Sequence, residues 1–120
     1  MAHKVEWENK GIYWKYSGDV SGQEIVDASV AIYGDPRFDD LDYKLVDFLD
    51  ASAVNMSDIE VARIAYQHKA AELSNPNIKN AIVMTVAIDL ADKFAAFFSD
   101  SGWEVKVFQE LDAANEWLGR

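Results

Sequence analysis

The chain opens with alternating hydrophobic and polar residues, a period of two that is typical of half-buried strands. Val5 and Trp7 alternate with charged residues, and the alternation resumes over Ile12 to Tyr16 after the link Asn9-Lys10-Gly11. Glycine readily takes the left-handed conformation that a tight turn needs. The first strand and the second are therefore predicted to form an antiparallel hairpin.

Two later segments are apolar almost throughout, as expected of strands that are covered on both faces in a parallel sheet. Leu45 to Leu49 is interrupted only by Asp47, and Ile78 to Val86 is the second such segment. The first runs into Asp50-Ala51-Ser52, which are residue types of a turn. A final alternating strand is predicted over Trp103 to Val107.

Helix signals lie between these strands. Ser21 with Glu24 three residues later forms a capping-box sequence, and Ser57 and Asp89 are residue types that begin helices. The predicted helices run from Ser21 to Gly34, from Ser57 to about Leu73, from Asp89 to Gly102, and from Leu111 to Leu118.

The element order is therefore ββαβαβαβα. Single helices between strands require parallel neighbours joined by right-handed crossovers. We expect one α/β domain over residues 1–120, with a five-stranded mixed sheet whose first strand is antiparallel, whose last four strands are parallel, and on which the helices pack.

Composition and charge exclude several classes of protein. The net charge is −10 and its carboxylates are spread along the chain, so the surface should repel nucleic acids and anionic membranes. No apolar run is long enough to span a bilayer and no secretory signal opens the chain, so a cytoplasmic protein is expected. Without cysteine there is no thiolate nucleophile and no cysteine-bound metal.

The segment Val46 to Val54 (VDFLDASAV) resembles the apolar strand, Asp and small-residue turn of the SpoIIAA-like fold. This fold is shared by sulfate-transporter and anti-sigma-factor-antagonist (STAS) domains and, more remotely, by CRAL-TRIO lipid carriers. The closing segment from Asp112 to Leu118 is similar to the short amphipathic helix that ends such domains. Residues 33–38 and 101–105 look like a stand-alone, functionally uncharacterised bacterial branch.

The resemblance draws attention to Ser57. Signalling members of the family carry an Asp-Ser-Ser/Thr-Gly sequence where the second helix begins, and a kinase phosphorylates a serine there. Here the segment reads Asn55-Met56-Ser57-Asp58-Ile59, without the neighbouring Ser and Gly. Ser57 is thus a candidate helix cap or phosphorylation site.

Enzymatic chemistry has weaker support. The residues expected at the carboxyl ends of the strands are carboxylates and hydroxyls, and neither His3 nor His68 is placed to join a catalytic triad with them. Asp19, Asp50 and Asp89 could supply oxygens to a divalent cation, but each also has an ordinary role at a turn or helix start. We therefore expect no enzyme, no metal site and no cofactor.

The predicted helix from Ser57 carries two apolar stripes at a spacing of about 100° per residue. The stripe expected to face the core is Ile59, Ala62, Tyr66, Ala70 and Leu73. The opposite stripe is expected either to be covered by other helices of the chain or to form a partner face; it consists of Val61, Ile64, His68 and Ala71. In a partner face, His68 would make the contact sensitive to pH.

These patterns favour a non-catalytic protein-interaction or regulatory module. It is expected to form a homodimer or to bind another protein. The alternative is a small hydrophobic-ligand or lipid-binding protein, as the CRAL-TRIO kinship and the many aromatic residues suggest.

Overall fold

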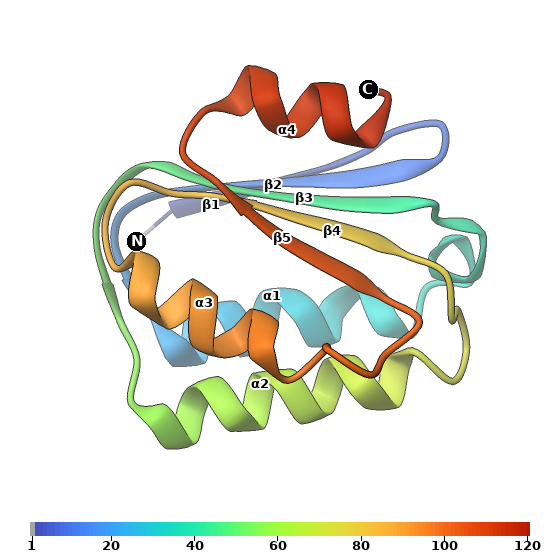
Figure 1. Ribbon diagram of the computed structural model, residues 1–120, viewed down its shortest axis with the longest axis horizontal. Coiled ribbons are helices and arrows are strands. Elements are labelled where there is room, and N and C mark those ends of the chain that lie inside the picture. Colours follow the sequence, from blue (N-terminus) through green and yellow to red (C-terminus); the bar gives the residue numbers. More distant parts are fainter. Residues whose placement is uncertain (1) are drawn as a thin grey trace.

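The computed structural model describes residues 2–120 and has three layers, with a five-stranded sheet between two layers of helices (Figure 1). The strands are β1 (Ala2–Trp7), β2 (Gly11–Ser21), β3 (Tyr43–Asn55), β4 (Lys79–Val83) and β5 (Glu104–Phe108). The helices are α1 (Gly22–Tyr33), the 3₁₀ helix η1 (Pro36–Asp40), α2 (Asp58–Ala71), α3 (Ile88–Ala96) and α4 (Leu111–Leu118).

The strands lie in the sheet in sequence order, β1 to β5. β1 pairs antiparallel with β2, and every other pair is parallel. The three crossover helices α1, α2 and α3 lie on one face of the sheet, and α4 covers the other face (Figure 1). The predicted α/β fold and its mixed sheet are confirmed.

β2 and β3 run further than their sequences predicted. The turn predicted at Asp50-Ala51-Ser52 is wrong, because these residues continue β3, and Ser17 and Gly18 of β2 lie opposite Asp50 and Ala51. Pairing with β2 gives their backbone groups ladder hydrogen bonds, which outweigh the turn preference of the side chains. Gly18 absorbs an irregularity in this ladder with a positive φ of 71°.

The ends of α3 and β4 also differ from prediction. α3 starts at Ile88 after Ala87, which has a left-handed φ of 55°, so Asp89 lies inside the helix and does not cap it. The helix ends at Ala96, well before Gly102, and β4 ends at Val83. Between α1 and β3 the chain forms η1, which Asp35 caps by accepting from the Arg37 amide, 2.9 Å away.

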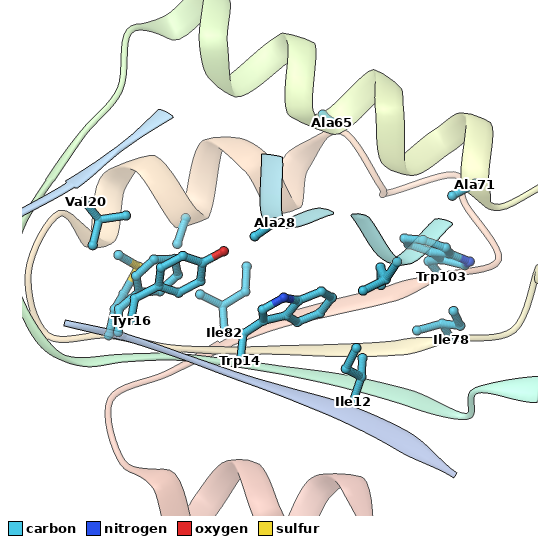
Figure 2. Close-up of a cluster of buried hydrophobic side chains, with 14 of the residues drawn as sticks. Ile12, Trp14, Tyr16, Val20, Ala28, Ala65, Ala71, Ile78, Ile82 and Trp103 are labelled. Carbon is cyan, nitrogen blue, oxygen red and sulfur yellow. The ribbon is translucent and has the colours of Figure 1, made fainter. Parts of the chain in front are cut away.

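Two cores lie on the two faces of the sheet. The larger fills the space between the sheet and α1–α3, where Trp14, Tyr16 and Ile82 point from the strands toward Ala28 and Ala65 (Figure 2). The smaller lies under α4 and is built from Leu45, Ala81, Val83 and Ala114. The central strands are therefore buried on both faces, as their apolar sequences predicted. Across residues 2–120 no helix combines the length and apolarity needed to cross a membrane.

Asn75 joins three parts of the chain at the end of the sheet where α2 leads into β4. Its buried Nδ2 donates to the carbonyls of Phe38 (2.9 Å) and Leu41 (2.8 Å). The backbone carbonyl of Asn75 accepts from the indole Nε1 of the fully buried Trp103, at 2.6 Å. The side chain thus holds the loop before β3 against the chain that enters β4.

Replacing Asn75 with Ala should leave the carbonyls of Phe38 and Leu41 without that donor. We expect the free energy of unfolding to fall by about 2 kcal/mol, as is typical of a buried group that loses its hydrogen bond. Denaturant unfolding measures this, with Asn77→Ala at an exposed site as the matched control. Equal stability of the two variants would contradict the role given to Asn75.

Candidate functional site

Ser57 is the N-cap of α2. Its Oγ accepts from the Glu60 amide at 3.1 Å, and a Glu60 carboxylate oxygen accepts from the Ser57 amide at 3.0 Å. This reciprocal pair is a complete capping box. The cap prediction for Ser57 is confirmed, while its phosphorylation stays a prediction.

Carboxylates already surround this helix start. The Glu60 carboxylate accepts from the amide of the N-cap residue, and Asp58 forms an ion pair with Lys93 of α3 at 3.0 Å. Both negative groups suit the positive end of the helix dipole. A phosphate on Ser57 would therefore meet two carboxylates as well as the helix amides.

The two faces of α2 are reversed relative to the sequence-based expectation. Ile59, Tyr66 and Leu73, which were expected to face the core, are 73%, 62% and 89% exposed. The expected partner face is buried inside the chain instead, and its members are Val61, Ile64, His68 and Ala71. Other parts of the same chain cover this stripe, which is the alternative that the sequence left open.

His68 explains why this stripe can be buried. Its Nδ1 lies 2.8 Å from the Ile64 carbonyl of the preceding turn, so this ring nitrogen has a hydrogen-bond partner within the helix. The rings of Tyr33, Phe94 and Trp103 pack edge-on around it. Burial is the main cause that holds the pKa of His68 well below its usual value, and the nearby charge of Lys44 lowers it further. His68 is therefore a neutral core residue, and the pH-sensitive partner contact expected of it is wrong.

Lys44 is the least expected residue of the core. It lies on β3, is 1% exposed, and its Nζ contacts the Tyr33 hydroxyl at 3.4 Å. The rings of Trp14, Tyr33 and Trp103 have their centroids 5.0 to 5.4 Å from the same atom. No carboxylate within residues 2–120 forms an ion pair with it. Burial lowers the pKa of Lys44 to about 7.

Lys44 lines a cavity of about 80 Å³ between the sheet and α1–α3. His68 of α2 and Asn80 of β4 line it too, together with Trp14 of β2. Two buried donors in this lining, Trp14 Nε1 and Asn80 Nδ2, have no hydrogen-bond partner in the described chain. The remaining wall is mostly apolar. The cavity thus presents hydrogen-bond donors within a mostly apolar wall, an arrangement common in small-molecule sites.

The carboxylates considered for a cation are separated or paired. Asp19 accepts from the Ser52 hydroxyl at 3.1 Å, and Asp50 pairs with Lys15 at 3.2 Å, while Asp89 lies on α3. Residues 2–120 contain no group of three side chains suited to hold a metal. His3 packs against the Tyr16 ring, with centroids 5.6 Å apart, and its Nδ1 lies 3.8 Å from a Glu24 carboxylate oxygen.

Lys44 and Asn80 were missed at the level of sequence, although a signal was present. Each is a polar residue within a strand predicted to be covered on both faces, and the register places them directly opposite each other. A polar side chain in such a strand cannot reach water and must find a partner inside the protein.

Comparison with known proteins supports the fold. No protein-family profile matches the sequence, and no curated protein matches it either. Two solved structures are similar along nearly the whole chain. One is an uncharacterized protein of the DUF3478 family with a SpoIIAA-like fold from Shewanella loihica PV-4, at 14% identity and a TM-score of 0.57, covering 98% of this chain and 92% of that one.

The other is the anti-sigma factor antagonist SpoIIAA in its unphosphorylated form. It has 12% identity and a TM-score of 0.61, and the match covers 99% of this chain and 100% of that one. At these identities the likeness concerns the fold, which is SpoIIAA-like.

Removing the hydroxyl of Ser57 tests the capping box. Ser57→Ala should lower the free energy of unfolding by about 1 kcal/mol, because the Glu60 amide loses its acceptor. Chemical denaturation measures the loss, with Ser99→Ala at an exposed site as the matched control. An unchanged midpoint would show that the cap contributes nothing to stability.

The lowered pKa of Lys44 predicts a pH dependence of stability. Between pH 7 and the unfolded pKa of 10.5, the unfolded chain holds a proton on Lys44 that the folded chain lacks. The free energy of unfolding should therefore rise with pH from about 7 to 9.5, by up to about 1.4 kcal/mol per pH unit. Above pH 10 the buried tyrosines Tyr16 and Tyr33, whose pKa values are raised by burial, act in the opposite direction.

Lys44→Met should remove this rise and leave a flatter profile over the same range. Denaturation midpoints of both proteins, taken at constant ionic strength, measure the difference. Parallel profiles would mean that Lys44 titrates normally in the folded protein.

Proposed function

We propose that this protein is a non-catalytic regulatory module that works by binding protein through the outer face of α2, and that its first partner is a second copy of itself. The observation that carries the proposal is the exposure of Ile59 and Tyr66 on that face and of Leu73 in the turn that follows the helix. Large apolar side chains gathered on one exposed helix face are typical of interaction surfaces. The SpoIIAA-like fold agrees, since SpoIIAA is an antagonist of another protein, an anti-sigma factor.

We name this surface the α2 stripe and define it by Ile59, Ala62, Tyr66, Ala70 and Leu73. The three large residues are seven positions apart, which is the repeat of a helix-to-helix seam, and Leu73 stands in the turn just after the last helical residue. Alanines lie between them, so the backbone of a second helix can come close. The surface is therefore shaped for another helix.

The stripe is also symmetric about its centre. Ile59 and Leu73 lie at equal distances in sequence on either side of Tyr66. A second α2 laid antiparallel would place each Ile59 on the other copy's Leu73, and the two Tyr66 rings on each other. A twofold interface requires this reciprocity, in which residue i meets j and j meets i. Antiparallel packing also opposes the two helix dipoles favourably.

The charges at the ends of the stripe are held within each copy. Asp58 pairs with Lys93, and the Glu72 carboxylate accepts from the amides of Gly102 and Trp103 at 2.8 and 3.2 Å. These acids therefore do not face a partner unpaired. The whole chains repel each other, at −10 apiece, so association should strengthen as salt screens that repulsion.

The interface is small. One helix face offers less than the roughly 800 Å² per partner of a standard stable interface. We therefore expect a reversible dimer whose population depends on protein concentration. The lipid-carrier alternative finds less support, because the cavity of about 80 Å³ is roughly half of one that encloses benzene.

A charge at the centre of the stripe should break the dimer. Tyr66→Glu places two carboxylates against each other across the twofold axis and should yield the monomer mass at every concentration. Light scattering coupled to gel filtration, over a series of protein and salt concentrations, measures this. The wild type should approach twice the chain mass as either concentration rises.

Two control variants separate binding from folding. Val30→Glu changes a half-exposed apolar residue of α1 in the same way and should dimerise like the wild type. Ile64→Glu charges the buried face of α2 and should unfold the protein, as seen by circular dichroism. A wild type that stays monomeric throughout, or a Tyr66→Glu variant that still dimerises, would refute the self-association.

A further inference from the structure

We propose that the cavity beneath α2 binds a small carboxylate, of about the size of acetate or propionate. Lys44, Asn80 and Trp14 donate hydrogen bonds to its oxygens. The site lies on the inner side of α2 and is independent of the α2 stripe on the outer side. Nothing in the proposed interaction function requires it.

The polar groups of Lys44, Trp14 and Asn80 select an acceptor, and the hydroxyls of Tyr16 and Ser29, which also line the cavity, can donate as well. A lysine ammonium and an indole N–H can only donate hydrogen bonds, and the unsatisfied atom of Asn80 is its amide nitrogen, which also donates. An ionised carboxylate only accepts, through two oxygens that take several bonds. Among small organic groups it matches this donor set best.

The three side chains lie on one face of the sheet. Lys44 of β3 is the register partner of Asn80 on β4, and Trp14 of β2 is the partner of Val46, two residues further along β3. Trp14 points from the sheet toward the helices, beside Ile82 (Figure 2). The donors are thus placed on rigid central strands, and their position does not depend on a mobile loop.

The remaining wall suits a short alkyl group. Phe48, Ile82, Met84 and Phe94 line it with carbon and sulfur. At ~30 Å³ per water molecule, about 80 Å³ is the room of two or three waters. That is enough for a few non-hydrogen atoms, and longer acids should be excluded.

Charge supplies the main reason for a bound anion. A buried ammonium without an opposite charge is strongly disfavoured, and Lys44 has only the Tyr33 hydroxyl and aromatic faces around it. Water could fill the space but would not provide a counter-charge. A carboxylate there would turn an unpaired amine into a buried ion pair.

The titratable side chains that line the cavity are Tyr16, Lys44 and His68, with Tyr33 next to Lys44. Burial raises the pKa of both tyrosines and lowers that of His68 well below its usual value. Only Lys44 changes its charge between pH 7 and 9. Because binding needs the ammonium form, affinity should fall up to tenfold per pH unit above about 7.

The experiment is a titration of isotope-labelled protein followed by nuclear magnetic resonance. Sodium acetate and sodium propionate are the probes, sodium chloride is the control for ionic strength, and acetamide is the uncharged control of similar shape. The indole N–H signal of Trp14, assigned with Trp14→Phe, and the side-chain amide signal of Asn80 report on the site. Acetate or propionate should shift both signals saturably, and chloride and acetamide should not.

Variants and pH complete the test. Lys44→Met should weaken binding at least tenfold, while Lys10→Met, at an exposed lysine, should leave it unchanged. Tyr66→Glu should also bind the acid like the wild type. The test of the cavity therefore stays valid even if the protein does not dimerise. If Lys44→Met does not fold, the pH series on the wild type decides alone.

Three outcomes would overturn the proposal. They are an absence of saturable shifts with any short acid, equal responses to acetate and chloride, and an affinity that stays constant from pH 7 to 9. Hexanoate that binds as well as propionate would refute the size limit that the cavity imposes.

Discussion

The central strand β3 is covered on both faces, and this burial governs what its polar residues can do. Its side chains point alternately to the core under α1–α3 and to the smaller core under α4. Asp47, on the α4 side, accepts from the Tyr13 hydroxyl and the Leu49 amide, both at 2.8 Å. Lys44, on the other side, has no comparable partner. Since a water molecule could bring no opposite charge to it, the Lys44 amine is the most costly buried group of this strand.

α2 separates the two sites that the structure suggests. Its inner face, with Val61, Ile64 and His68, forms part of the cavity wall, and its outer face is the α2 stripe. The outer face is the surface that we propose for self-association, and exposed apolar residues of this kind are typical of interaction surfaces. The capping box at Ser57 and the bonds of Glu72 hold both ends of this helix in place.

The sequential strand order explains where a site can and cannot lie. With α1, α2 and α3 all on one face, no crossover reverses direction, so the sheet has no switch-point crevice at its carboxyl edge. The space that remains lies between the sheet and the helical layer. The SpoIIAA-like structures share the overall fold at 12 to 14% identity, so very different sequences support it.

Local patterns in the sequence determined the element types, their order and the parallel sheet, because strand and helix periods and the cap at Ser57 are set by neighbouring residues. They did not determine where β2 and β3 end, since pairing between the two strands overrides the turn preference of Asp50 and Ser52. Nor did they determine which stripe of α2 faces inward. Both stripes are apolar, and only the surrounding rings and the Ile64 carbonyl make a buried His68 acceptable. The pairing of Lys44 with Asn80 under three helices likewise arises from strand register, a property that no single segment contains.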